Sequence, residues 1–441
     1  LSAVSLILMA GIEDQLMAVS PLDGRYSEQT AELGPYFSEY ALIRNRVAVE
    51  VGWLSTLASG TLPDVEPLGD VAQERLAYIS LSFSVTDATR VKDIEATTRH
   101  DVKAVELWLR EHLEADGYDT FADYLELIHF GCTSEDINNL AIGTMVRDGW
   151  HDALKPSRQR VVDDLHKKTD EYANMPLLSQ THGQSATPTT LGKEMRVFAD
   201  RLTRHIQVLG GISMYGKFNG ASGTYAAAEI AYPEVDWPRV NRAFVEGFGL
   251  EYAGATTQIE CHDWMARYFN EISLGNTVMT DLARDMWAYI SRGVFSQQVV
   301  AGEVGSSTMP HKVNPIDFEN AEANFGLANA TLIHLAGKLP ISRLQRDLSD
   351  SSAQRAIGSG FGHTLLAQKS LLRGLGKVNP DEATMKDELR GEYSLLGEAV
   401  QTVLRRYKVP GGYDMLKAAT RGKPLDEDSY FALVTELDIP E

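Results

Sequence analysis

The sequence predicts a mainly α-helical protein with a long central helix bundle, and three observations support this prediction. Apolar residues recur at spacings of three and four over residues 191–209 and 264–290, which is the periodicity of a buried helix face. Strand-like runs are few and short. A chain of 441 residues exceeds one ordinary core, so we expect two or three domains. We place an N-terminal helical domain at 1–118, the bundle at 119–368 and a small C-terminal helical domain at 369–441.

Composition limits the partners and the compartment. With 61 acidic and 41 basic residues the formal net charge is −20, which argues against nucleic acid because backbone phosphates require a basic surface. Cys132 and Cys261 give no disulfide framework and suit a reducing cytoplasm. No apolar run approaches the roughly 20 residues of a membrane span. Residues 1–15 lack the pattern of a signal peptide, and we expect them to form a disordered lead-in to a cytoplasmic protein.

Residues 301–320, AGEVGSSTMPHKVNPIDFEN, interrupt the helical pattern. Gly302 and Gly305 loosen the backbone, and Pro310 and Pro315 remove backbone donors. The segment therefore cannot be helical throughout. A polar loop between two long apolar helices is a poor core element, but it presents hydroxyls, backbone N–H groups and a cation to a ligand. The groups that it would present are Ser306, Ser307, Lys312 and Asn314.

A turn near the N-terminus carries the first candidate residues. Residues 19–26 are rich in turn formers and place Arg25 and Tyr26 on a loop. Helices are expected to follow over 37–57 and 71–83. An exposed arginine in a turn is ordinarily only solvated, so a functional role for this one needs a second indication.

Two further turns open helices with residues that can cap them. His100 and Asp101 head an amphipathic helix, where an acidic residue is favoured by the helix dipole. Thr133 or Ser134 precedes acidic residues in the pattern of a helix N-cap. Capping alone explains both observations. The alternative is a binding site, because the N-terminus of a helix also presents free N–H groups to an anion.

His182 lies in a polar loop, LSQTHGQSATP, before the apolar stripe of residues 191–209. A lone histidine in a loop is most often a surface residue, although Gly183 beside it permits close approach of the backbone. Residues 216–223 form a glycine-rich turn without the P-loop pattern, and we interpret this turn as a structural corner near the site.

Residues 342–355 carry three arginines and four serines, which would suit a solvated face. In so acidic a chain the cluster better suits a clamp for phosphate or carboxylate groups. The sequence has no residues at metal-ligand spacing, no P-loop and no dinucleotide fingerprint, so neither a metal nor a cofactor is expected. The loop groups suit removal of a proton beside a carboxylate. Lys312 and Asn314 would stabilise the developing charge, and an imidazole would protonate a leaving nitrogen.

The stretch GSSTMPHKVNPIDFEN resembles the signature loop of the fumarase/aspartase superfamily, and its His311 and the following PIDFEN resemble the adenylosuccinate lyase branch. The motifs SPLDGRY, TTRHDVKAVE, CTSEDINN, THGQ and SRLQRDLSDS also occur in family order, between about residues 20 and 423. The resemblance implies a three-domain helical fold and elimination of fumarate from adenylosuccinate and from the succinyl-carboxamide ribotide of purine biosynthesis. It also implies small-molecule substrates, no cofactor, and a homotetramer whose sites are each drawn from three subunits.

The resemblance further implies the roles of individual residues. Ser306 would remove the Cβ proton, His182 would protonate the leaving nitrogen with His100 beside it, and Lys312 would hold the serine oxyanion. Ser185 stands where the family usually has Pro, and Arg99 stands where bacterial relatives commonly have Asn. Substrate contacts are implied for Arg25, Tyr26, Arg99, Asp101, Thr133, Ser134, Gln258, Val313, Asn314, Asn320, Arg346, Ser351 and Arg355.

Two alternatives stay open at this point. A sister lyase, such as argininosuccinate lyase or a fumarase, acts on substrates without a ribose phosphate, which would leave Arg25, Ser351 and Arg355 without a purpose. A catalytically silent structural relative, comparable to some lens crystallins, would have no need to retain Ser306 and His182.

Overall fold

The computed structural model describes residues 12–115, 119–299, 302, 308–309, 311–391, 393–421 and 425–437. The chain divides into two compact units. Unit 1 comprises residues 1–158, 205–277 and 323–369, and unit 2 comprises residues 159–204, 278–322 and 370–441. Among the described residues, none of the helices has both the length and the hydrophobicity to span a lipid bilayer. The division into three domains at residues 118 and 368 stays a prediction.

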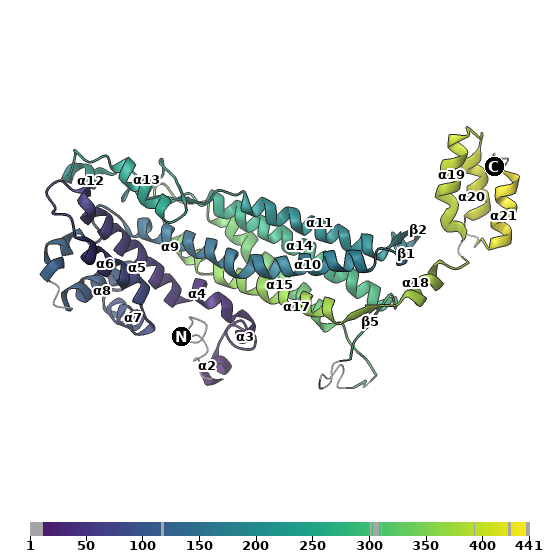
Figure 1. Cartoon of the computed structure of the whole chain (residues 1–441), viewed down its shortest axis with the longest axis horizontal. Coiled ribbons are helices and arrows are strands. Elements are labelled where there is room, and N and C mark those ends of the chain that lie inside the picture. The colour runs from purple at the N-terminus through teal and green to yellow at the C-terminus, as the bar shows by residue number, and fades with distance from the viewer. Residues whose placement is uncertain are drawn as a thin grey trace. The chain divides into compact units, whose positions relative to one another are not determined.

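Unit 1 begins with a cluster of short and medium helices (Figure 1). The predicted helices are confirmed as α5 (Glu39–Thr56) and α6 (Asp70–Ser82). The expectation of disorder is wrong for residues 12–15, which belong to α2 (Ile12–Met17), whereas residues 1–11 lie outside the described residues. The other elements are α3 (Ser27–Thr30), η1 (Ala31–Leu33), α4 (Gly34–Phe37), η2 (Leu57–Thr61), α7 (Val85–Thr98), α8 (Asp101–Ala115), η3 (Asp119–Leu127), α9 (Ser134–Gly149) and η4 (Trp150–Leu154).

Helix α5 is the element on which this cluster is built, because α6, α8 and α9 all pack against it. Ser38 starts α5 as an N-cap, and its Oγ accepts the backbone N–H of Ala41 at 3.1 Å. The buried face of α5 includes Trp53, whose ring packs against Phe218 and Phe244 with centroids 4.5 and 5.1 Å away. Burial of such aromatic surface supplies much of the stabilising free energy of this core.

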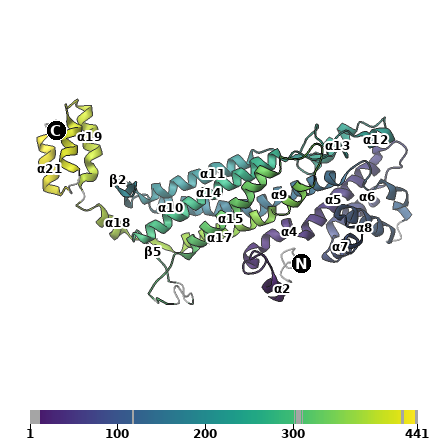
Figure 2. The ribbon, with the colours of Figure 1, turned by 180° about the vertical axis from the view of Figure 1, so that it is seen from behind.

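Five long helices contribute residues to both units: α10 (Lys155–Glu171), α11 (Leu191–Gly210), α14 (Asp263–Ser291), α15 (Ile316–Lys338) and α17 (Ile357–Gly376). In unit 1 the apolar stripes of α11, α14, α15 and α17 contribute to one core, where Trp264 and Tyr268 of α14 pack with Leu332 of α15 and Phe361 of α17. Both views show α14, α15 and α17 side by side (Figures 1 and 2). The predicted apolar stripe is therefore largely confirmed.

Trp287 of α14 is an exception to this stripe. We expected Trp287 in the bundle core, but its side chain is 46% exposed. Its indole Nε1 donates a hydrogen bond to Glu319 Oε1 at 3.2 Å, which leaves much of the apolar ring on the surface. The expectation failed because spacing of three and four identifies one face of a helix, and Trp287 lies at the edge of that face.

Strands are short, as expected. In unit 1, β3 (Tyr215–Gly216) and β4 (Glu251–Tyr252) pair in parallel. In unit 2, β1 (Pro176–Thr181) and β2 (Gln184–Thr190) form an antiparallel hairpin, and β5 (Phe295–Gln297) pairs antiparallel with β6 (Val378–Pro380). The remaining helices are α12 (Ala226–Ala231), α13 (Trp237–Gly247) and α16 (Ser349–Gln354) in unit 1, and α18 (Glu382–Leu389), η5 (Tyr393–Leu396), α19 (Gly397–Arg406), α20 (Gly412–Thr420) and α21 (Glu427–Glu436) in unit 2.

Candidate active site

A cavity of about 350 Å³ in unit 1 brings together residues from three separate motifs. Its wall is formed by the α7–α8 junction, the start of α9 and the segment around α16, with one side of α5. Six of the predicted site residues line it: His100, Asp101, Ser134, Arg346, Ser351 and Arg355. Motifs separated by more than 200 residues in the sequence thus meet in one place.

A left-handed residue turns the chain between α7 and α8. Arg99 ends α7 with φ of 56°, and its N–H donates to the carbonyl of Glu95 at 2.8 Å. The next residue, His100, accepts the backbone N–H of Lys103 on its Nδ1 at 3.1 Å and so caps the start of α8. Because Nδ1 is the acceptor, the proton of a neutral imidazole is on Nε2. Nε2 is therefore the atom through which His100 can act on a ligand.

Asp101 joins two guanidinium groups at the cavity wall. Its Oδ2 lies 2.7 Å from Arg46 Nη2 and 3.1 Å from Arg355 Nη2. Burial alone raises the pKa of Asp101, but the charge and hydrogen bond of Arg46, the Val102 N–H and the charge of Arg355 outweigh it, so the pKa is lowered. Asp101 is therefore anionic at neutral pH, and it holds both arginines in place.

Arg46 is a cavity residue that sequence reasoning missed. It is only 3% exposed, its Nε donates to Asn138 Oδ1 at 2.8 Å, and its buried Nη1 has no hydrogen-bond partner. A buried donor without a partner is costly, so this nitrogen is a candidate contact for an anionic ligand. In the sequence, Arg46 could have been found as a charged residue within the apolar run of α5. The other unpredicted polar residues of the wall are Ser38, Glu39, Asn138, Ser352 and Gln354.

The start of α9 is held by a buried ion pair. Thr133 is the N-cap, and its backbone N–H donates to Asp136 at 2.8 Å. Asp136 also pairs with Lys217 at 2.6 Å, with both side chains fully buried, and accepts the N–H groups of Asn219 and Gly220. The glycine-rich turn at residues 216–223 is therefore the structural corner that we expected. It fixes the helix N-terminus that carries the cavity residue Ser134.

Arginine side chains give the cavity its electrostatic character. Arg346 donates to Asp350 at 2.8 Å and to Ser351 Oγ at 3.0 Å, and Arg355 also pairs with Glu39 at 3.0 Å. With Arg46, three guanidinium groups line this one cavity. Each of the three is paired with a carboxylate, so the cavity offers oriented guanidinium donors, which suit a ligand with several anionic groups.

A second cavity of about 440 Å³ adjoins the first and shares Phe37, Ser38, Arg355 and Gly358 with it. The turn that carries Arg25 and Tyr26 lines this second cavity through its neighbours Ser20, Leu22, Asp23 and Ser27. Arg25 itself lies over the Tyr26 ring, with its Cζ 5.8 Å from the ring centroid.

Several predicted residues of unit 1 do not line the first cavity. Gln258 donates its side-chain amide to the carbonyl of Ala221 at 2.7 Å, which ties it to the glycine-rich turn. The predicted residues of unit 1 outside the cavity lining are Arg25, Tyr26, Arg99, Thr133 and Gln258.

His182 lies at the tip of the β1–β2 hairpin of unit 2. We expected an irregular loop, but Thr181 pairs with Gln184, so the turn consists only of His182 and Gly183. Both are left-handed, with φ of 55° and 70°, as two-residue hairpin turns of the primed type require. The imidazole of His182 is exposed at the end of this two-stranded hairpin.

The predicted loop at residues 301–320 is placed only in part. Ser306 and Ser307 lie outside the described residues. Lys312 is exposed, the carbonyl of Val313 accepts from Gln297 Nε2 at 2.6 Å, and α15 begins at Ile316, soon after Asn314. Asn320 accepts the Ser370 hydroxyl at 2.7 Å. These residues and His182 belong to unit 2, whereas the cavity belongs to unit 1.

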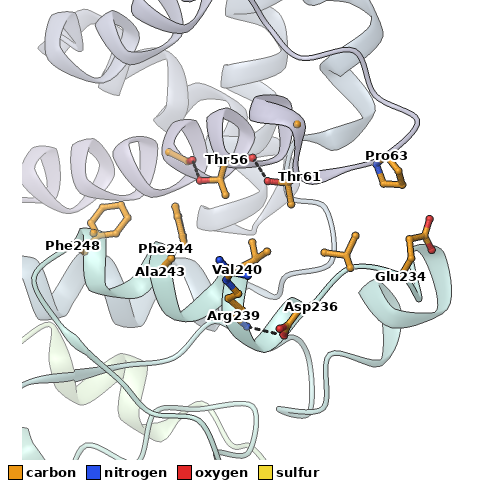
Figure 3. A pocket seen from close by; sticks show the side chains of 14 residues that line it. Thr56, Thr61, Pro63, Glu234, Asp236, Arg239, Val240, Ala243, Phe244 and Phe248 are labelled. Atoms are coloured by element: carbon orange, nitrogen blue, oxygen red, sulfur yellow. Dashed lines mark hydrogen bonds between the residues drawn. The ribbon is translucent and has the colours of Figure 1, made fainter.

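A larger cavity of about 750 Å³ in unit 1 holds none of the predicted residues (Figure 3). Thr56 and Thr61 reach it from α5 and η2, but their hydroxyls bond to backbone carbonyls of the same segment. Val240 and Phe244 of α13 give the opposite wall an apolar surface. Its charged lining residues Glu234, Asp236 and Arg239 all come from one short segment, so this cavity is a weaker candidate for catalysis than one at which several motifs meet.

Comparison with known proteins relates this chain to lyases. A family model described as "Lyase" matches residues 24–328, and one described as "Adenylosuccinate lyase C-terminal" matches residues 342–441. The adenylosuccinate lyase of Haemophilus influenzae is 45% identical over 427 residues, covering 97% of this chain and 93% of the relative. That of Escherichia coli K12 is 46% identical with the same coverage.

Solved structures support the fold. A fumarate lyase from Mesorhizobium sp. BNC1 superposes with a TM-score of 0.72 at 18% identity, covering 88% of this chain and 85% of that one. The 3-carboxy-cis,cis-muconate lactonizing enzyme from Pseudomonas putida gives 0.72 at 20% identity, with coverage of 92% and 91%. These similarities confirm the mainly α fold with long helices.

Proposed function

Because the chain belongs to the adenylosuccinate lyase family, we propose that it eliminates fumarate from adenylosuccinate to give AMP. The same reaction on the succinyl-carboxamide ribotide gives the carboxamide ribotide, so both activities serve purine biosynthesis. The observation that carries this proposal beyond the family is the cavity lined by Arg46, Arg346 and Arg355. Its guanidinium donors match substrates that carry two carboxylates and a phosphate.

The elimination needs a base and an acid on opposite sides of one C–N bond. Ser306 removes the proton from Cβ of the succinyl group, and the electron pair forms the C=C bond of fumarate as the C–N bond breaks. His182 donates a proton to the leaving nitrogen, which becomes the amino group of AMP. Lys312 and Asn314 stabilise the charge that develops on the neighbouring carboxylate. Support for these roles comes from the motifs and from the exposed position of His182 at the tip of the hairpin.

Substrate binding falls to the other predicted residues. Arg346, Ser351 and Arg355 bind anionic groups of the substrate, and Nε2 of His100 faces the reacting end. The adjoining cavity beside Arg25 and Tyr26 extends the site far enough for a nucleotide, since the two cavities share Arg355. Contacts by Arg99, Asp101, Thr133, Ser134, Gln258, Val313 and Asn320 complete the proposal.

The proposal includes a cytoplasmic homotetramer. Apolar side chains stay exposed on two long helices, Leu274 and Trp287 on α14 and Leu327 and Ile333 on α15. Exposed apolar surface on long helices is typical of a protein interface. Shared sites in such an assembly would bring together catalytic groups from different subunits.

A pair of adjacent serine variants tests the assigned base. Ser306→Ala should reduce kcat for fumarate release from adenylosuccinate by about a hundredfold or more, because the group that accepts the Cβ proton is lost. Ser307→Ala is the matched control and should keep most of the activity. If Ser307→Ala greatly reduced kcat and Ser306→Ala changed it little, the assignment of Ser306 as the base would be wrong.

A further inference from the structure

A cluster of buried ionisable groups lies directly behind the cavity. Its centre is His262, which is 0% exposed. The imidazole Nδ1 lies 3.5 Å from Glu260 Oε2, and Nε2 lies 3.4 Å from Asp350 Oδ2. Glu135, the second residue of α9, is also buried and lies close enough for its carboxylate to share this space. His262 does not line the cavity, and no role in the proposed reaction has been assigned to it.

The backbone at His262 is held in an unusual conformation. Its φ is 59°, in the left-handed region, where a residue with a side chain is disfavoured. Its N–H donates to Glu260 Oε2 at 2.8 Å, which fixes this conformation one residue before α14 begins. Left-handed residues other than glycine persist where the surroundings determine them, and they occur preferentially at functional sites.

The cluster connects to the cavity through one carboxylate. Asp350 Oδ2, which faces His262, also accepts Arg346 Nη1 at 2.8 Å. Asp350 Oδ1 accepts the backbone N–H of Ser351 at 2.7 Å. Arg346 in turn reaches Ser351 Oγ at 3.0 Å and lies 3.4 Å from Glu135. The two cavity residues Arg346 and Ser351 are therefore both anchored on the carboxylate that His262 contacts.

We propose that His262 is a positioning residue, which as a buried imidazolium holds Asp350 and thereby fixes Arg346 and Ser351 for the substrate. The proposal rests on the proposed function, in which Arg346 and Ser351 bind an anionic group of adenylosuccinate. Without the imidazolium, the buried carboxylate of Asp350 would keep the guanidinium of Arg346 but lose its contact with a second cation, which would weaken the anchor of Arg346 and Ser351. A positioning role of this kind acts on binding of the substrate rather than on transfer of its protons.

The charges of the cluster favour a proton at its centre. Burial alone lowers the pKa of His262, but the hydrogen bond of its imidazole to Asp350, the nearby carboxylate of Glu260 and the charge of Glu135 raise it to about 9. Burial raises the pKa of Glu135 to about 7, even though His262, Arg346 and Lys217 oppose this change. At neutral pH the two cations His262 and Arg346 are thus balanced chiefly by Glu260 and Asp350.

A metal ion is the other occupant that this cluster could hold, since Glu135, His262 and Asp350 are residue types that ligate divalent cations. The adjacent guanidinium of Arg346, 2.8 Å from Asp350 and 3.4 Å from Glu135, repels such an ion. A metal would also require the neutral imidazole, whereas the surroundings favour the imidazolium. The cluster therefore favours a protonated His262 over a bound metal ion.

His262→Asn tests the proposal, because Asn tolerates the left-handed conformation but cannot carry the charge. We expect the KM for adenylosuccinate to rise by about tenfold, with kcat changed by less than about threefold. His205→Asn is the matched control: His205 of α11 also pairs with a carboxylate, Glu271 of α14, but unlike Asp350 this carboxylate anchors no lining residue of the cavity in the described part of the chain. It should leave KM and kcat unchanged. Equal kinetic effects of the two variants, or a loss confined to thermal stability, would overturn the proposal.

The pH dependence supplies a readout that a purely structural role would not give. The wild-type KM should rise as the pH passes through about 9, where His262 loses its proton, in addition to any change near pH 7 from Glu135. This extra rise should be absent from His262→Asn. The histidine imidazoles can also be labelled with ¹³C and titrated by NMR, and the His262 signal is the one that is absent from the variant. The pKa of His262 should be well above 6.5, whatever the substrate of the enzyme is. A lack of lyase activity in the wild type would reject the proposed function. A normal or low pKa of His262, or loss of its titration on added Zn²⁺, would reject the positioning role.

Discussion

At the scale of single residues, the cavity is organised by carboxylates that orient arginines. Asp101 holds Arg46 and Arg355, and Asp350 holds Arg346. Each carboxylate is itself fixed by a neighbouring N–H group, from Val102 or Ser351 respectively. Such preorganisation lowers the cost of ordering flexible arginine side chains when an anionic ligand binds.

Arg355→Ala should raise the KM for adenylosuccinate by about tenfold and change kcat little, because a hydrogen bond to a charged group contributes about 1.5–3 kcal/mol in ground state and transition state alike. Steady-state kinetics of fumarate release would measure this. Arg343→Ala is the control, since Arg343 is highly exposed, pairs with Asp347 and does not line the cavity. An unchanged KM for the Arg355 variant would remove this arginine from the site.

Asp101→Asn should lower the thermal midpoint at pH 7 but have a smaller effect near pH 3. The pKa of Asp101 is lowered in the folded protein, so its stabilising contribution is present above the ordinary pKa of about 3.9 and is lost as the pH falls through the folded value. Scans of wild type and variant at both pH values would test this difference. A midpoint shift of the same size at both would mean that the ionised carboxylate contributes no stability.

At the scale of elements, spacing and caps predicted most of the helices. The apolar stripe identified α11, and Thr133 identified the start of α9. The β1–β2 hairpin could not be predicted in the same way, because its sequence lacks alternating apolar residues and its turn depends on a left-handed His182. Arg46 and His262 were missed for a related reason: a buried charge has meaning only with its partners, and these include residues far along the chain, Asp101 and Asn138 for Arg46 and Asp350 for His262.

Gly183→Ala tests the role of the hairpin turn. Space around Gly183 is open, so the methyl group acts only through the left-handed backbone, where it costs about 1 kcal/mol. Distortion of the turn should displace His182 and lower kcat several-fold with a small change in KM. Gly247→Ala in α13 has equally open space and no left-handed φ, and kinetics of this control should match the wild type. An unaffected kcat in the Gly183 variant would argue against His182 as the acid.

At the scale of the whole molecule, catalytic groups are proposed on both compact units, His182 in unit 2 and His100 in unit 1. The proposed homotetramer allows one active site to use these groups from different subunits. Sequence could indicate an assembly only through resemblance, because an exposed residue such as Trp287 looks the same in sequence as a buried one.

Subunit mixing tests the shared site. Ser306→Ala and His182→Ala proteins should each be inactive, and a mixture that has exchanged subunits should regain part of the activity, because some hybrid sites contain both wild-type residues. Activity should be measured before and after exchange, with mass spectrometry of labelled subunits to show that exchange occurred. No recovery in exchanged tetramers would place both groups on one chain.

The central claim is that this chain releases fumarate from a succinylated purine nucleotide. The most direct measurement is fumarate formation by the purified protein with adenylosuccinate, argininosuccinate and malate offered in parallel. We predict rapid formation of fumarate and AMP from adenylosuccinate, which Ser306→Ala abolishes, and none from the other two substrates. Turnover of argininosuccinate or malate in preference to adenylosuccinate, or of none of the three, would contradict the account.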